Sequence, residues 1–335
     1  MVPPEIILDR YVKAGNFPQG YVGKLDIEQV KSPALRTFLE GLQAETNEAL
    51  GMENANASGG VVHPPIHFDF LDSTLTNAHA IPLDDYWYIV LTLPLVISIS
   101  ETAKALSRSQ SVLQLLNLKI EEMQHPDILW SFLGQILMLF LTAHEYTHLV
   151  HKHKAGTVLS GMWTEFTIPD DQGGIESQAE ELNADSYSAY LNLAFLLRSE
   201  RRERALIQFG RDTLPRRDAD ELIVSCYLLA LMAFFRTRWP ANIGTPLDQL
   251  SHPPVPVRID YLIKTVGMWC GQFDVLNQPW FTSPQITALF QAAATGGNEL
   301  NQEDWDVQVA FLTSAPGDVY RNLVFEKAEK LRRQE

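Results

Sequence analysis

The 335-residue chain contains little cysteine, fewer basic than acidic residues, and no hydrophobic run long enough to cross a membrane as a helix. Its two cysteines, Cys226 and Cys270, are too few for a disulfide framework and are typical of a reducing compartment. The opening sequence MVPPEIILDR has no basic segment followed by an apolar stretch, so no secretory signal is expected. These absences predict a cytoplasmic protein.

Negative charge predominates, since 26 lysines and arginines stand against 41 acidic residues and give a net charge of −15. A surface of this sign repels phosphate backbones and anionic lipid, so a nucleic-acid partner is not expected. The three most apolar runs, at 86–100, 128–143 and 222–235, are each shorter than the roughly 20 residues of a membrane-spanning helix. They predict buried core elements, and membrane association is not expected.

The composition is otherwise that of a globular chain with a sizeable core, 46% hydrophobic and 20% charged. Two segments, 66–70 and 86–93, predict strands from their aromatic and β-branched residues. Helical spacing predominates elsewhere and predicts helices at about 95–120, 127–154, 175–198, 218–238, 256–269, 284–294 and 317–333. We predict an α+β, mostly helical protein with a small sheet. The expected domains are an N-terminal helical extension and loop over 1–60, a core over 61–270, and a C-terminal helical segment packed on the core over 271–335.

One segment carries a recognisable chemical pattern. The stretch LTAHEYTHLVHKHK contains H-E-x-x-H at His144, Glu145 and His148. Residues four apart lie on one face of a helix, so both imidazoles can reach one metal ion. Glu145 is rotated from His144 by about 100° and lies beside the ion, where a base can take a proton from metal-bound water. Because this short pattern also arises by chance, the interpretation depends on a third ligand.

A catalytic zinc site needs three protein ligands and an open fourth position. The metzincin pattern would place Gly at 151 and His at 154, and His151 and Lys154 exclude it. His151 is also about 10 Å along the helix from His144, too far to share its ion, and is interpreted as lying beside the site or exposed. The alternative is a glutamate from a second helix, for which the candidates are Glu176, Glu180 and Glu181.

Glu181 is the preferred candidate because Asp185 lies one helical turn further along the chain and faces the same way. One carboxylate can then bind the metal while the other accepts a hydrogen bond from a ligating imidazole. An acidic, solvated helix face accounts for the other two glutamates.

These motifs resemble those of gluzincin metallopeptidases of the HtpX and CAAX-prenyl-endopeptidase type. The resemblance covers about residues 75–265 and departs from the family at Leu83-Asp84-Asp85, where glycines are usual, and at His79, where an aromatic is favoured. Its four parts are H-E-x-x-H-x-x-x-x-H from His144 to His153, E-x-x-A-D from Glu181 to Asp185, S-H-P-x-x-x-x-R-I from Ser251 to Ile259, and an N-A-x-A turn at Asn77–Ala80 followed by the strand at 86–93.

The resemblance implies a zincin-like core with an edge strand beside the H-E-x-x-H helix and one Zn²⁺ per chain. In this interpretation His144, His148 and Glu181 bind the zinc, Asp185 orients a zinc histidine, and Glu145 is the catalytic base. His252 and Arg258 would stabilise the oxyanion or gate the open site. The alternative is that His252 caps a helix and Arg258 pairs with an acid. An extended peptide would add to a substrate strand that contains Asn77, Ala78, Tyr88 and Val90.

The function expected from these residues is that of a zinc metalloendopeptidase acting on protein or peptide substrates through Glu-assisted attack of zinc-bound water. Two alternatives stay open. One is a narrowly targeted or gated protease of the phage-exclusion (Lit-like) type, and the other is a catalytically silent, metal-stabilised interaction module. The presence of Glu145 argues against the silent module, because a protein that only binds has no need of that base.

Overall fold

The computed structural model describes residues 2–17, 20–56, 64–83, 85–151, 163–164, 174–237, 250, 252–296, 306 and 309–334. Helices make up most of these residues, and the strands among them form one mixed sheet. The predicted class, α+β and mostly helical with a small sheet, is therefore confirmed. The backbone groups into two compact units, Met1–Ile97 with Glu145–Asp170 and Ser98–His144 with Asp171–Glu335. The linear division at residues 60 and 270 stays a prediction.

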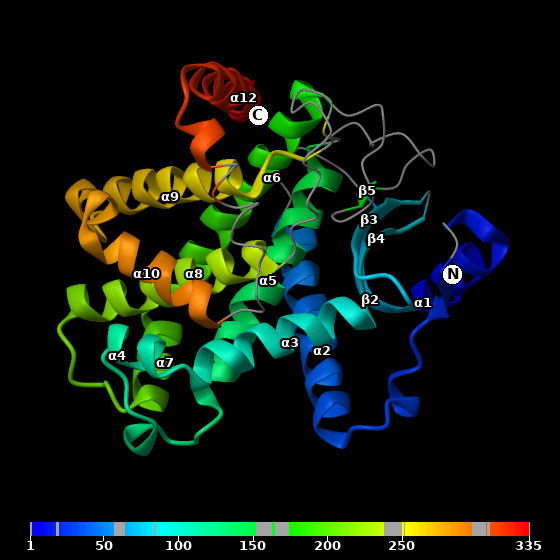
Figure 1. The fold of residues 1–335 in the computed structure, drawn as a ribbon. Coiled ribbons are helices and arrows are strands. Elements are labelled where there is room, and N and C mark those ends of the chain that lie inside the picture. The colour runs from blue at the N-terminus through cyan, green and yellow to red at the C-terminus, as the bar shows by residue number, and fades with distance from the viewer. Residues whose placement is uncertain are drawn as a thin grey trace. The chain divides into compact units, whose positions relative to one another are not determined.

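The first unit holds the sheet, whose five strands follow the order β1-β2-β4-β3-β5 (Figure 1). Within the sheet, β2 and β4 are parallel, whereas β3 is antiparallel to β4. The elements are α1 (Pro4–Tyr11), the π-helical turn η1 (Val12–Asn16), β1 (Tyr21–Lys24), the 3-10 turn η2 (Ile27–Gln29), α2 (Pro33–Asn56), β2 (Ile66–Ser73), β3 (Ala78–Pro82), β4 (Trp87–Thr92) and β5 (Trp163–Thr164).

The position of β4 corrects the expectation of an edge strand at 86–93. Because β4 lies between β2 and β3, its backbone donors and acceptors on both sides are used within the sheet. An extended peptide cannot add to a strand that already has two neighbours. Tyr88 and Val90, predicted to line a substrate strand, are fully buried residues of this internal strand. The uninterrupted apolar sequence of β4 is that of a strand covered on both faces.

The sheet is covered by α1, which the sequence analysis did not predict. Leu8 of α1 belongs to the same buried cluster as Ile81 of β3 and Tyr88 of β4. The Tyr88 hydroxyl also donates a hydrogen bond of 2.9 Å to the carbonyl of Pro4. These contacts attach the N-terminal helix to the sheet through both apolar packing and a backbone acceptor.

The second unit is helical. The helices predicted from residues 127, 175, 218, 256, 284 and 317 all begin within two residues of those positions. The elements are α3 (Leu93–Arg108, whose first turn belongs to the first unit), α4 (Gln110–Leu115), η3 (Ile120–Glu122), α5 (Ile128–Val150), α6 (Ile175–Leu196), α7 (Ser199–Phe209), α8 (Arg216–Thr237), α9 (Val255–Gln272), η5 (Gln278–Thr282), α10 (Pro284–Gly296) and α12 (Ala315–Gln334).

The single helix predicted over 95–120 is instead two helices, α3 and α4. They are separated at Ser109, whose backbone is extended with φ −73° and ψ 120°. The chain then leaves the helical conformation after α4 at Asn117, which has a positive φ of 51°. The helical spacing of hydrophobic residues continues across Ser109. The sequence pattern therefore gave no sign that the helix is interrupted there.

The C-terminal helix α12 packs on α6 and α9 within the second unit (Figure 1). Its Tyr320, Val324 and Ala328 belong to one buried cluster with Ala179 and Leu182 of α6, and this cluster also includes Val257 and Tyr261 of α9. The packing brings α12 against the two helices that carry Glu181, Asp185 and Arg258.

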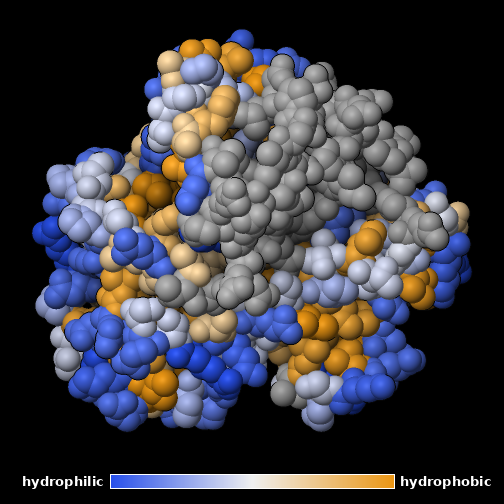
Figure 2. Space-filling view, viewed as in Figure 1, coloured by the Kyte–Doolittle hydropathy of each residue, from blue (hydrophilic) through white to orange (hydrophobic). Residues whose placement is uncertain are grey.

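Among the described residues, α5 alone has the length and apolar composition of a membrane-crossing helix. Of its most apolar 18-residue window, 61% is buried inside the structure, as in the core helix of a folded unit. On the face drawn in Figure 2, the described surface is mainly hydrophilic, with hydrophobic residues in separate patches.

Gly210 ends α7 in the left-handed conformation, with φ 67° and ψ 35°, and a Cβ added there would lie 2.2 Å from the Glu122 carbonyl oxygen. We expect Gly210→Ala to lower the free energy of unfolding by more than about 1 kcal/mol, because backbone strain and a steric clash act together. Gly41 of α2 is the control, since nothing lies within 4 Å of a Cβ added there. Gly41→Ala is expected to stabilise by about 0.5–1 kcal/mol. Urea denaturation followed by circular dichroism measures both, and equal effects would contradict this account.

Candidate metal centre

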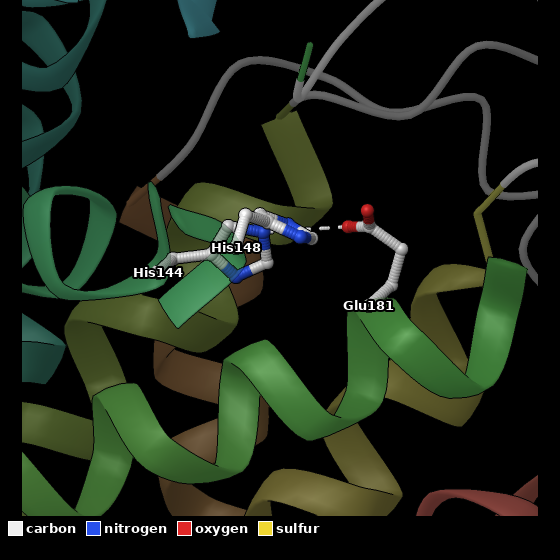
Figure 3. A group of neighbouring side chains, drawn as sticks. All are labelled: His144, His148 and Glu181. Carbon is white, nitrogen blue, oxygen red and sulfur yellow. Dashed lines mark ion pairs between the residues drawn. The ribbon is translucent and has the colours of Figure 1, made fainter. Parts of the chain in front are cut away.

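Two helices bring the predicted metal ligands together. His144 and His148 lie one turn apart on α5 and point toward Glu181 of α6 (Figure 3). One ligand atom from each residue lies within 4.8 Å of the other two, and all three residues are buried. His144 Nε2 is 3.3 Å from Glu181 Oε2. Ligands held about 2 Å from a tetrahedral zinc ion are themselves about 3.3 Å apart. The spacing of this pair therefore allows both atoms to bind one metal ion.

The H-E-x-x-H segment lies on one continuous helix. The boundary between the two compact units falls inside α5, after His144, yet the helix runs unbroken from Ile128 to Val150. The places of His144, Glu145 and His148 relative to one another therefore follow from helix geometry. Glu145 is only 1% exposed and lies, as predicted, on the neighbouring face of the helix.

Asp185 contacts the ring of His144. Its Oδ1 lies 3.0 Å from His144 Nδ1, and both side chains are completely buried. A carboxylate can only accept here, so Nδ1 carries a proton, and in the neutral imidazole the lone pair is then on Nε2, the nitrogen that faces Glu181. This is the tautomer that a metal ligand requires. The predicted pairing of Asp185 with the His144 imidazole is therefore present in the structure.

Arg258 of α9 binds the same carboxylate with two nitrogens. Its Nε donates to Asp185 Oδ2 at 2.8 Å, and its Nη2 donates to Oδ1 at 2.7 Å. The guanidinium also lies over the ring of Phe235, 4.4 Å from its centre. Pairing with an acid, the alternative considered for Arg258, is thus what the structure shows. Arg258 acts on the centre through Asp185 and His144.

The charges around the centre favour a divalent cation. Glu145, Glu181 and Asp185 are buried carboxylates, and Arg258 is a buried cation. When ionised, these three acids and one base leave two negative charges. Buried charge is costly unless it is compensated, and a divalent ion would compensate this excess. The same field reaches α8, where burial raises the pKa of the Tyr227 hydroxyl and the charge of Asp185 raises it further.

His252 lies at the outer side of the cluster, where its Nε2 is 3.5 Å from Glu181 Oε2. Its side chain is 22% exposed, compared with 11% for that of Glu181. The structure therefore brings His252 to the predicted centre within ion-pair distance of the acidic ligand. Its role toward an oxyanion stays a prediction.

The other candidates make contacts of their own. Glu176 is exposed and pairs with Lys327 of α12 at 2.9 Å, which supports its interpretation as a surface acid. Asn77 and Ala78 lie at the start of β3, where the Asn77 Oδ1 accepts from the Ala78 backbone at 3.1 Å. Their role in substrate binding stays a prediction. His153 and Ser251, part of the motif resemblance, lie outside the described residues.

Sequence reasoning missed one residue beside the centre. Gln178 of α6 lies one turn before Glu181, is completely buried, and bonds to Tyr320 of α12. The sequence did show that Gln178 is a polar residue on the same face of the predicted helix as Glu181 and Asp185. No pattern pointed to a partner 142 residues away.

Replacing Arg258 by lysine keeps the positive charge but removes the bidentate hydrogen bonding to Asp185. We expect Arg258→Lys to lower the free energy of unfolding of the metal-free chain by about 2 kcal/mol, the cost of one lost charged hydrogen bond. Zinc affinity is expected to fall about tenfold because His144 loses its fixed partner. Arg202 is the matched control, since it contacts Asp220 through one nitrogen at 2.9 Å, which lysine can replace. Arg202→Lys changing zinc affinity as much as Arg258→Lys would contradict this role.

Burial lowers the pKa of the His151 imidazole to about 4. The unfolded chain binds this proton below about pH 6.5, whereas the folded chain binds it only near pH 4. Stability of the metal-free chain is therefore expected to fall as pH drops from 6.5 to 4. Two-dimensional NMR should show the His151 ring titrating near pH 4, and His151→Gln should flatten the pH dependence of unfolding in this window. A His151 ring that titrates near pH 6.5 would show that this imidazole is solvated and would contradict the prediction.

Comparison with protein-family models, curated proteins and solved structures finds no match for this chain. The likeness to gluzincin metallopeptidases therefore rests on the sequence motifs, and what the structure adds is a buried His144, His148 and Glu181 group that can hold a metal ion.

Proposed function

We propose that this protein is a zinc-dependent endopeptidase that binds one Zn²⁺ through His144, His148 and Glu181. The observation that carries the proposal is the convergence of these three side chains, from two helices, within 4.8 Å of one another. Two imidazoles and one carboxylate are a donor set used by catalytic zinc sites, in which a fourth position stays open for water or substrate.

The residues around the group support catalysis as well as binding. When bound, zinc would lower the pKa of a coordinated water and polarise the scissile carbonyl. Glu145 takes the proton from the attacking water on its carboxylate and then delivers it to the leaving amine, so that the proton balance of the cleavage closes. Glu145 is only 1% exposed, so its carboxylate lies in surroundings of low polarity. There the carboxylate, and not bulk solvent, transfers the proton.

The residues behind the ligands keep them in one arrangement. Asp185 fixes the His144 tautomer, and Arg258 holds Asp185 in place with two hydrogen bonds. We assign His252 to the outer side of the centre, where a histidine can donate to an oxyanion that forms during attack. We assign no strand to substrate binding, because β4, the strand expected to bind an extended peptide, is internal to the sheet.

The test compares wild type with Glu145→Gln. Purified or zinc-reconstituted wild type is expected to contain one zinc per chain and to cleave unfolded protein substrates. Glu145→Gln should retain the zinc and lose cleavage by at least about 100-fold, the contribution of a general base. Glu180→Gln is the matched control, because Glu180 neighbours Glu181 on α6 but is not one of the three grouped residues. It should retain both zinc and activity.

The outcomes separate this proposal from its alternatives. A chain that binds no zinc contradicts it altogether. Zinc without cleavage of any general substrate would favour the gated, narrowly targeted protease or the silent module instead.

Both cysteines are buried and unbridged, and the cytoplasm remains the location predicted for this activity.

A further inference from the structure

The side-chain amide of Gln178 bridges two segments that lie far apart in the sequence. Its Nε2 donates a hydrogen bond of 2.8 Å to the carbonyl of Leu250, and its Oε1 accepts one from the hydroxyl of Tyr320. Gln178 is completely buried, and Tyr320 is 9% exposed. Both ends of one amide are thus used, one toward the segment before α9 and one toward α12.

The Leu250 end of this bridge leads to the metal centre. Leu250 is buried and lies two residues before His252, whose Nε2 is 3.5 Å from Glu181 Oε2. Gln178 itself lies three residues before Glu181 on α6, which is less than one helical turn. The same helix therefore carries Glu181 and anchors Leu250, which lies two residues before His252.

The Tyr320 end is held by apolar packing. Tyr320 belongs to the buried cluster that joins α12 to α6 and α9, beside Ala179 and Leu182. Ala179 and Leu182 flank the ligand-bearing turn of α6 in the sequence. The Tyr320 hydroxyl is therefore fixed, and it orients the Gln178 amide so that its NH₂ group faces Leu250.

We propose that Gln178, oriented by Tyr320, is a positioning residue that sets the place of His252 against Glu181. Through Tyr320, the C-terminal helix α12 thereby supports the geometry of the metal centre. This inference rests on the proposed zinc site. Glutamine suits the task because it offers a donor and an acceptor at the same point. Leucine fills a similar volume with neither group, and it would leave the Leu250 carbonyl and the Tyr320 hydroxyl without these bonds.

The experiment measures zinc dissociation constants by chelator competition on the full-length chain. Gln178→Leu is expected to weaken zinc binding about tenfold, as is usual when a group that supports a ligand is lost. Tyr320→Phe, which removes only the orienting hydroxyl, should give a smaller change in the same direction. The visible absorption spectrum of the Co²⁺-loaded chain should change in both variants, which a loss of stability alone would not cause.

The matched control is Tyr261→Phe. Tyr261 lies in the same buried cluster, and its hydroxyl donates to Glu329 of α12 at 3.2 Å. This variant is expected to lose stability like Tyr320→Phe but to keep its zinc affinity within about twofold, the usual scatter between independent sites. Thermal unfolding of each variant shows that the chains compared are folded.

A double-mutant cycle shows whether Gln178 acts through His252. In a His252→Ala chain, adding Gln178→Leu is expected to change zinc affinity by less than about twofold. A full tenfold loss in that background, or equal losses for Tyr261→Phe and Tyr320→Phe, overturns the inference and leaves the zinc site standing. Wild type that binds no zinc overturns both proposals.

Discussion

A single buried carboxylate, that of Asp185, joins the helices on which the metal centre depends. It accepts from His144 on α5 and from two nitrogens of Arg258 on α9, while it belongs itself to α6. None of these groups is exposed enough for water to replace its partner. In such surroundings each bond depends on the others, because the loss of one leaves a buried charge uncompensated. The orientation of His144, and with it the geometry offered to a metal, follows from this one junction.

The helices around the junction are held together by further contacts that reach away from the centre. Ser188 of α6 donates to the Phe140 carbonyl of α5 at 2.9 Å, and Phe235 of α8 lies beneath the Arg258 guanidinium. The cluster with α12 also packs on α6 and α9. A segment that carries no predicted ligand thus packs directly on the helices that carry Glu181, Asp185 and Arg258. Rigid support of this kind is what a catalytic metal centre needs.

The sheet shows where local patterns reach their limit. The residues of β4 were correctly predicted to form a strand, because an apolar, β-branched and aromatic run of this length favours one. Whether a strand lies at an edge depends on its neighbours, and here β2 and β3 occupy both sides. An internal strand and an edge strand with one covered face can have similar sequences. The prediction of an edge strand at 86–93 was wrong for that reason.

The sequence by itself determined the features that depend on helix geometry alone. Two histidines four residues apart share a face of α5, and Glu181 and Asp185 share a face of α6, because 3.6 residues complete one turn. Only the tertiary structure decided that Glu181 faces the histidines while Glu176 pairs with Lys327, that Arg258 binds Asp185, and that Gln178 meets Tyr320. The last three of these pairings join residues 73 to 151 positions apart. Such pairings are decided by how helices pack in three dimensions, and a periodicity read along one segment contains no information about the segment that will lie against it.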